Sequence, residues 1–396
     1  MSEGIEARVE AAQIVSRVLD EGGYSNVLLA PAGELSEVDR ARRAALVYGV
    51  LRNVPWIDSL LESQAGRAVD SLDPTVRSIL RVGAFELVVK HAKAYAVVDS
   101  CVEATRRLGA PRAAGLVNAV LRKVATSGVT APGPGSSVPD WIGERLGRTH
   151  GAGDAAAFLA ASDAPAPVGV RFRDGRDQGS LGIVGASYVE SVESLGQVSY
   201  DVVDPASTAV ANAVGAEPGM RVLDIGAAPG GKTAALWDAM GGDGVLVALD
   251  SHRRRLARMR GRMRALGVRA ALTLGDGRIP PFRPGVFDRV LLDAPCTGLG
   301  TLRRRPEIRY RIEESSPAAL GELQRSLLDA ALDLVRPGGR LVYSVCTVFE
   351  EETVAVVADR GAAPPPDLPG RRWGDGLLLA PHITDTDGMF IAGFDR

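Results

Sequence analysis

The sequence predicts a fold of the α/β class: a doubly wound, mostly parallel sheet in the C-terminal part, preceded by an all-α domain. Two observations carry this prediction. Apolar residues recur at helical spacing up to about residue 128. From Arg221 onward they form short, nearly all-apolar runs, several of them separated by helical stretches. Such runs are typical of parallel strands that are buried on both faces of a sheet.

The first 128 residues read as helices. "LDPTVRSILRVGAFELVVK" (72–90) carries apolar residues at helical spacing, with Asp73 as the expected N-cap and Pro74 in the first turn. "AYAVVDSCVEATRRLG" (94–109) repeats this pattern, and "PRAAGLVNAVLRKVATSG" (111–128) opens on proline and closes on glycine. Cys101 lies on an apolar stripe, so we expect it to be a small core residue.

Residues 129–140 are predicted to be a linker, because "SGVTAPGPGSSVPD" (127–140) is rich in Gly, Pro and Ser and has no periodicity. Residues 141–200 suggest a small α+β unit, in which the helical "DWIGERLGR" precedes the strand-like "PVGVRF" and "LGIVGASYV". The α/β domain is expected to span residues 201–396.

Five runs in the α/β domain are candidate strands: "RVLDIG", "GVLVALD", "AALTLGD", "FDRVLLDAP" and "RLVYSVCT". The first leads into "VLDIGAAPGGKT" (222–233), a strand, glycine-rich turn and helix that fits neither the Walker A nor the GxGxxG pattern. Asp250 ends the next strand, where a carboxylate can accept hydrogen bonds from ribose hydroxyls, and Asp276 is expected to end the third. This series predicts a nucleoside-bearing cofactor.

Composition narrows the class of protein. With 46% hydrophobic and 24% charged residues among 396, the chain reads as soluble and globular. It has no apolar run of membrane-spanning length, and its charged, helical start does not resemble a secretory signal. Three cysteines without CxxC spacing indicate neither a disulfide framework nor a zinc site. We therefore expect a cytoplasmic protein with reduced thiols and no metal.

Positive charge is local, because the net charge of the whole chain is −2. Seven arginines fall within His252–Arg264, and "RRRPEIRYR" (303–311) holds five more. If the partner is a nucleic acid, the second segment is the better candidate for phosphate contacts, because it follows Cys296 near the expected substrate end. The first could contact such a partner or could simply be solvated. Tyr310 could stack on nucleotides, or it could be a core or surface tyrosine.

Several motifs resemble those of the Sun/Fmu (RsmB-like) RNA cytosine-5 methyltransferases: "DIGAAPGGKT", "DAPCTGLGTLRRRPEIRYR", "QRSLLDAALDLVRPGGRLVYSVCT" and "DGMFIAGF". "LVYGVLRN", "LDPTVRSILRVGAFEL" and "AAGLVNAVLRK" resemble the NusB-like domain attached to the ribosomal members. The likeness covers almost the whole chain; it is strongest over 221–350 and weakest over 141–200. It implies a Rossmann-like methyltransferase domain behind an RNA-binding NusB-like domain.

The resemblance also implies residue roles. It implies that S-adenosylmethionine is bound by Asp250, Asp276, Asp293 and the turn formed by Gly226, Ala227, Ala228, Pro229, Gly230, Gly231 and Lys232. It implies Asp293 at the reacting base, Cys346 as the nucleophile that forms a covalent adduct with cytosine, and Cys296 as its assistant. The implied substrate is RNA, with 16S ribosomal RNA of the small subunit expected. The unit 141–200 would contact RNA, and we expect a monomer.

This chain departs from the family pattern at three positions. Gly226 stands where the family often has Cys, Val345 replaces a threonine beside Cys346, and Thr353 replaces a familiar asparagine. Thr347 and Glu350 match a helix capping box after Cys346. A helix N-terminus would favour the thiolate whereas the glutamates at 350–352 would oppose it, and we interpret those glutamates as helix-capping charges.

Three other functions are compatible with parts of the sequence. A non-catalytic rRNA-binding or assembly factor would need no intact cofactor turn or thiols. A DNA cytosine-5 methyltransferase would attack with the cysteine of the Pro-Cys pair and leaves "YSVCT" without a role. A small-molecule methyltransferase would need neither the helical domain nor two active-site cysteines.

Overall fold

The computed structural model describes residues 4–30, 35–174 and 181–396. Its contacts divide the chain into two compact units. The first comprises Met1–Pro139 together with Arg304–Arg311, and the second comprises Asp140–Arg303 together with Ile312–Arg396. The segment 304–311 therefore lies far along the chain but belongs to the N-terminal unit.

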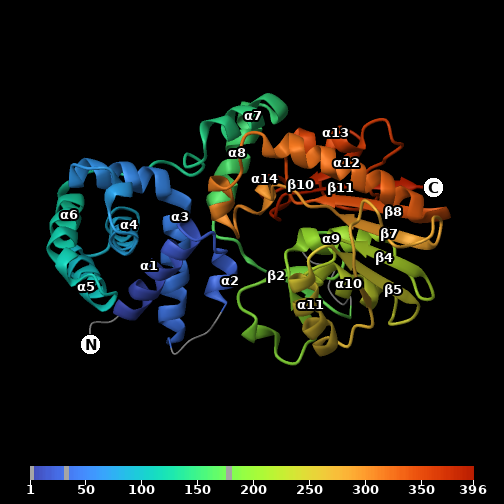
Figure 1. Ribbon diagram of the computed structural model, residues 1–396, viewed down its shortest axis with the longest axis horizontal. Coiled ribbons are helices and arrows are strands. Elements are labelled where there is room, and N and C mark those ends of the chain that lie inside the picture. Colours follow the sequence, from blue (N-terminus) through green and yellow to red (C-terminus); the bar gives the residue numbers. More distant parts are fainter. Residues whose placement is uncertain (1–3, 31–34, 175–180) are drawn as a thin grey trace. The chain divides into compact units, whose positions relative to one another are not determined.

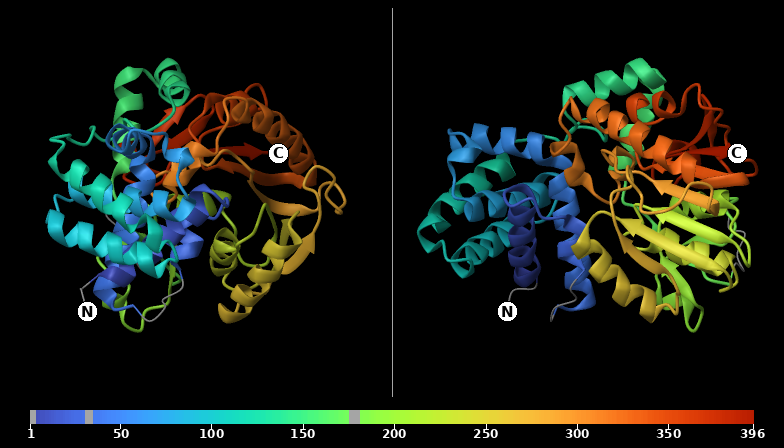
Figure 2. Two further views of the ribbon diagram at one scale, coloured as in Figure 1. Left: turned by 60° about the vertical axis from the view of Figure 1, so that its left-hand side comes forward. Right: turned by 45° about the vertical axis from the view of Figure 1, so that its right-hand side comes forward.

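The first unit is all-helical (blue to teal in Figure 2). Its helices are α1 (Ile5–Leu19), α2 (Ser25–Leu29), α3 (Glu37–Ala65), α4 (Pro74–Val88), α5 (Ala94–Arg107) and α6 (Ala114–Thr126). The predicted start of α4 is confirmed, because the Asp73 side chain accepts hydrogen bonds from the N–H groups of Thr75 and Val76. Cys101 is 1% exposed in the shared core, as expected, and burial raises its thiol pKa to about 12.

The second unit is built around a sheet that has eight strands in the described residues, in the order β6-β5-β4-β7-β8-β11-β10-β9. Neighbours from β6 to β8 are parallel and those from β8 to β9 are antiparallel. The strands are β4 (Arg221–Ile225), β5 (Val245–Asp250), β6 (Ala271–Leu274), β7 (Phe287–Asp293), β8 (Val335–Val345), β9 (Arg371–Trp373), β10 (Gly376–Leu379) and β11 (Met389–Asp395). The predicted mostly parallel α/β class is confirmed.

Helices cover both faces of this sheet (Figure 1). One face packs against α9 (Pro205–Val214), α10 (Gly231–Ala239) and α11 (Arg253–Ala265), and the other against α12 (Ser316–Leu334) and α13 (Val354–Val357). Strands buried on both sides need apolar residues at nearly every position, which explains the continuous runs in the sequence.

The region between linker and sheet has its own small elements. Helices α7 (Asp140–His150) and α8 (Ala152–Asp163) precede β1 (Val168–Phe172), β2 (Ala186–Val189) and β3 (Tyr200–Val202). The three strands form an antiparallel sheet in the order β2-β1-β3. The short helix α14 (Pro381–Thr384) contacts α8.

Candidate active site

The glycine-rich turn between β4 and α10 brings backbone atoms close together. Gly226 has a φ of 81°, and a Cβ atom there would lie 2.2 Å from the carbonyl oxygen of Asp293. Gly230, with a φ of 98°, precedes the first residue of α10. Only glycine fits both positions without strain. The turn therefore presents backbone rather than side chains at the carboxyl end of β4.

Asp250 fastens this turn to the next strand. Its carboxylate is 3% exposed and accepts hydrogen bonds from the N–H groups of Ala228 (3.1 Å) and His252 (2.8 Å). The Arg255 guanidinium lies 3.9 Å from it. A carboxylate has about four acceptor positions, so two bonds leave capacity for ligand hydroxyls.

Asp276 has a different setting from the one predicted. Strand β6 ends at Leu274, so the expectation that Asp276 ends the third strand is wrong. Its side chain is 42% exposed and pairs with Arg278 at 2.6 Å. Hydrogen bonds from Arg278 lower the pKa of Asp276. Its carboxylate is thus charged and engaged with a neighbour two residues away.

Asp293 lies at the carboxyl end of β7 and joins two other elements. Its carboxylate accepts a hydrogen bond from Lys232 Nζ at 2.9 Å and from Ser344 Oγ at 3.0 Å. Burial lowers the pKa of Lys232, but attraction to Asp293 and their hydrogen bond outweigh it and raise the pKa overall. The charges of Cys346 and Asp224 act in the same direction. Lys232 therefore remains an ammonium ion beside Asp293.

Asp224, in the interior of β4, was not singled out from the sequence. It is fully buried beneath the turn and accepts a hydrogen bond from Thr233 Oγ1 at 2.5 Å. Burial raises its pKa to about 7, against the effect of that hydrogen bond. A lone acid inside an apolar run carries no signal that would separate it from other strand residues.

The two predicted active-site cysteines lie in contact. The sulfur atoms of Cys296 and Cys346 lie 3.3 Å apart, although the residues follow different strands, β7 and β8. Their hydrogen bond, together with burial and the charge of Cys346, raises the pKa of Cys296 well above its usual range. Either sulfur can be the donor in this contact, and the ammonium of Lys232 interacts electrostatically with Cys346. The structure thus places both predicted cysteines at one site, with Lys232 near Cys346.

The segment after Cys346 differs from the predicted capped helix. Glu350–Glu352 form a single 3₁₀ turn, and α13 begins at Val354. The Thr347 hydroxyl donates to Glu352 at 2.9 Å instead of capping a helix with Glu350. The proposed helix-terminus support for the thiolate is thus missing, and the glutamates do not act as one group. Glu352 is fully buried whereas Glu350 is exposed.

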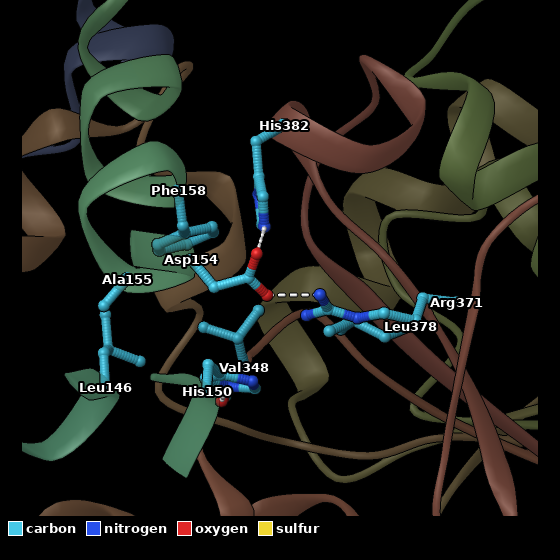
Figure 3. Close-up of a pocket in the computed structure, with 9 residues that line it drawn as sticks. All are labelled: Leu146, His150, Asp154, Ala155, Phe158, Val348, Arg371, Leu378 and His382. Carbon is cyan, nitrogen blue, oxygen red and sulfur yellow. Dashed lines mark hydrogen bonds and ion pairs between the residues drawn. The ribbon is translucent and has the colours of Figure 1, made fainter. Parts of the chain in front are cut away.

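Helices α7 and α8 pack behind the same segment (Figure 3). His150 donates a hydrogen bond to the carbonyl of Val348 at 2.8 Å, and Trp141 stacks on Phe349 with ring centroids 5.8 Å apart. In Figure 3, Asp154 points between Arg371 and His382. It forms an ion pair with Arg371, and His382 Nε2 lies 3.8 Å from its carboxylate. Burial lowers the pKa of His382. These contacts support the loop that follows Cys346 from outside the sheet.

Arg309, Tyr310 and Arg311 of the segment 303–311 form hydrogen bonds within the first unit. Arg309 is 1% exposed and donates to the carbonyls of Arg52 and Ser137, and Tyr310 donates to that of Leu51 at 2.9 Å. Arg311 donates to carbonyls at Val18 and Gly23. The expectation that this segment contacts phosphates is therefore wrong for the buried Arg309. For Tyr310, the alternative of a position packed against the core is confirmed.

The described residues contain neither a membrane-spanning helix nor a cluster of metal-binding side chains. Within 4–30, 35–174 and 181–396, every helix is too short or too polar to cross a lipid bilayer. Nowhere in those ranges do three His, Cys, Asp or Glu side chains gather as a metal ion would require.

Comparisons with known proteins agree with this architecture. Residues 5–126 match the NusB family, and residues 211–395 match the family described as "16S rRNA methyltransferase RsmB/F". The chain is similar to ribosomal RNA small subunit methyltransferase B of Xylella fastidiosa, with 33% identity over 99% of this chain and 98% of that protein. Its counterpart in Xanthomonas campestris pv. campestris is 31% identical over 98% and 97%.

Solved structures share the fold. The crystal structure of PH0851 covers 100% of this chain and 99% of its own at a TM-score of 0.83 and 22% identity. That of a methyltransferase homolog protein from Pyrococcus horikoshii covers 66% and 96% at a TM-score of 0.52 and 25% identity. With relatives above 30% identity over nearly the full length, the chain belongs to the RsmB/F family of methyltransferases and carries a NusB-family domain at its N-terminus.

Proposed function

We propose that this protein transfers a methyl group from S-adenosylmethionine to carbon 5 of a cytosine in RNA, through a covalent adduct with Cys346. The observation that carries the proposal is the pair of thiols 3.3 Å apart beside the Lys232–Asp293 ion pair. Carbon 5 of cytosine is a weak nucleophile until a thiolate adds at carbon 6 and makes an enamine. We propose small-subunit (16S) ribosomal RNA as the substrate, because the similar full-length proteins are named for that RNA.

The residues at the turn fit S-adenosylmethionine. A side chain at Gly226 would collide with the Asp293 carbonyl, so this glycine places the turn directly against the end of β7, next to Asp293. Asp250 keeps acceptor capacity for ribose hydroxyls. When bound, S-adenosylmethionine supplies the methyl group that the activated carbon 5 takes. We also propose Asp276 as a cofactor-binding residue. Its carboxylate would bind the cofactor while it remains paired with Arg278.

The protein's own groups divide the remaining work. The ammonium of Lys232 favours the thiolate of Cys346, which adds to carbon 6, while Asp293 faces ring nitrogen 3 and the exocyclic amine. Once Cys346 is a thioether, it carries no charge and no longer opposes ionisation of Cys296. Cys296 is then able to take part in removing the proton from carbon 5, so that Cys346 can be eliminated.

Two cysteine variants test the assignment. With RNA carrying 5-fluorocytosine at the target, Cys346→Ala should lose both methylation and covalent trapping. Cys296→Ala should still attack ordinary RNA and release slowly, so that adduct accumulates on a denaturing gel. Adduct with Cys346→Ala but none with Cys296→Ala would reverse the roles and favour chemistry of the DNA-methyltransferase type. Binding of rRNA without any methylation would favour a non-catalytic factor.

The target itself can be located directly. Bisulfite converts cytosine but not 5-methylcytosine. In ribosomal RNA from cells with the gene, one or more cytosines should therefore resist conversion, and the same cytosines should be converted in RNA from cells without it. A full set of unchanged 16S positions would contradict the proposed substrate while leaving the chemistry open to the gel assay.

For RNA contacts we propose the exposed face of α11. Five of its arginines reach solvent and have no acidic partner in the described parts of the chain: Arg253, Arg254, Arg258, Arg260 and Arg264. The helix begins three residues after Asp250, and its buried Met259 and Met263 lie next to Gly230 of the cofactor turn. Clustered arginines without internal partners suit phosphates. The RNA contacts expected of residues 141–200 and of the NusB-family domain remain predictions.

A further inference from the structure

The most connected carboxylate near the thiols belongs to Glu352, a residue without a role in the chemistry above. It is 0% exposed and accepts four hydrogen bonds. Oε1 accepts from the Thr297 N–H at 2.8 Å and from Gln324 Nε2 at 3.2 Å. Oε2 accepts from the hydroxyls of Thr297 at 2.6 Å and Thr347 at 2.9 Å.

These partners lie directly beside the two cysteines. Thr297 follows Cys296 on the loop after β7, and Thr347 follows Cys346 on the loop after β8. The two threonine hydroxyls are themselves 2.9 Å apart. Gln324 from α12 also donates to the carbonyl of Pro295 at 2.8 Å, just before Cys296. One side chain thus joins both cysteine loops and the helix behind them.

We infer that Glu352 is a positioning residue that holds the Cys296 and Cys346 loops together and so sets the spacing of the two sulfur atoms. The inference rests on the proposed function for its effect on turnover, but the spacing itself is a property of the protein alone. Burying a carboxylate has a high free-energy cost unless the carboxylate is well hydrogen-bonded. Both oxygens of Glu352 accept hydrogen bonds, three from the two cysteine loops and one from Gln324 of α12. Glu350, two residues earlier and exposed, offers a matched control.

The thiol spacing can be measured without activity. Dibromobimane fluoresces when it bridges two neighbouring thiols, and Cys101 is buried in the other unit. Full-length Glu352→Ala should bridge Cys296 to Cys346 at least about tenfold more slowly than the wild-type protein, whereas Glu350→Ala should match wild type. Misplacement of catalytic groups by about 1 Å can cost about 100-fold in rate. We therefore expect kcat of Glu352→Ala to fall by about that factor, with KM for RNA within about threefold.

Two conservative variants of Glu352 distinguish the effect of side-chain length from the effect of its negative charge. Glu352→Gln keeps the length, and its amide can donate to the two threonine hydroxyls, so it should restore bridging and most of kcat. Glu352→Asp keeps the charge but is too short to span both loops, so it should not. Circular dichroism and Tm check that each variant is folded, and Thr297→Val gives a second route to the same loop separation.

The inference would be overturned by wild-type bridging in folded Glu352→Ala, or by rescue with Asp but not with Gln, which would make the charge itself the functional element. Failure of the proposed function is distinguishable, because it would abolish adduct with the wild-type protein without changing the bridging rates of any variant.

Discussion

Two arginine-rich segments, α11 and residues 303–311, differ in how far their side chains are exposed. On α11, arginines separated by buried Leu256, Met259 and Met263 project into solvent. In 303–311, Arg309 is buried and Arg311 donates to backbone carbonyls of the helical unit. Glu307 of the same segment is 1% exposed and accepts from the N–H and hydroxyl of Ser25. Arginine density alone therefore does not indicate an RNA-binding surface.

The reason lies in what surrounds each segment. α11 is a regular helix whose backbone is satisfied internally, so its long side chains need no protein partner. The segment 303–311 contains only a 3₁₀ turn, Pro306–Tyr310, and it packs against helices whose backbone carbonyls accept its guanidinium and phenol groups. A guanidinium offers five donors in a fixed plane, which suits several carbonyls as well as it suits a phosphate.

The largest effect is expected from removing the partners of 303–311. A chain starting at Val138 would leave Glu307, Ile308 and Arg309 without the helices that bury them. Trypsin should then cut within 303–311 at least about 100-fold faster than in the full-length protein, because local opening is no longer opposed. Equal protection in the two chains would show that the segment is held by the α/β unit. A truncation of this kind is consequently a poor test of RNA binding by the helical domain.

A single substitution should reproduce part of this effect. Arg309→Ala removes a fully buried side chain and its bonds to two carbonyls. We expect a loss of about 3 kcal/mol or more in the free energy of unfolding. Thermal unfolding should show a Tm lower by roughly 5–10 °C. Arg258→Ala on α11 is the control and should leave Tm within about 2 °C; a Tm equally unchanged in Arg309→Ala would mean that its burial contributes little.

The reverse pattern is expected for α11. Replacing Arg254, Arg258, Arg260 and Arg264 with serine should weaken RNA binding by about 10- to 100-fold at low salt while leaving Tm unchanged. The slope of log affinity against log salt should flatten by about 0.7 for each lost phosphate contact on single-stranded RNA. The matched variant with four lysines should retain most of the slope. An unaltered slope in the serine variant would leave α11 as a solvated surface.

The smallest effect is expected for Tyr310→Phe. The phenol donates one hydrogen bond to the Leu51 carbonyl, and its removal should cost about 1 kcal/mol in the free energy of unfolding. RNA affinity should stay the same, since the ring is packed against the helical core. Denaturant unfolding and RNA titration of the same preparation measure both quantities. Weaker RNA binding at unchanged stability would assign Tyr310 to the substrate instead.

The sequence by itself determined the class of both units and the start of α4 at its Asp-Pro cap, while the roles expected of Cys296, Cys346 and Asp293 came from the resemblance of its motifs to a known family. These features are local: apolar periodicity, capping residues and glycine turns act over a few neighbouring residues. The parallel strands also implied that residues at their carboxyl ends meet. This is how two cysteines fifty residues apart could be expected at one site.

Only the tertiary structure separated residues that look alike along the chain. Three consecutive glutamates were interpreted as one set of capping charges, yet Glu352 alone accepts from both cysteine loops. Asp276 was grouped with Asp250, but it follows its strand by two residues and pairs with Arg278. Arg309 resembled the arginines of α11 until its burial was known. For Glu352 and Arg309 the hydrogen-bond partners include residues of distant segments, which no local sequence pattern shows.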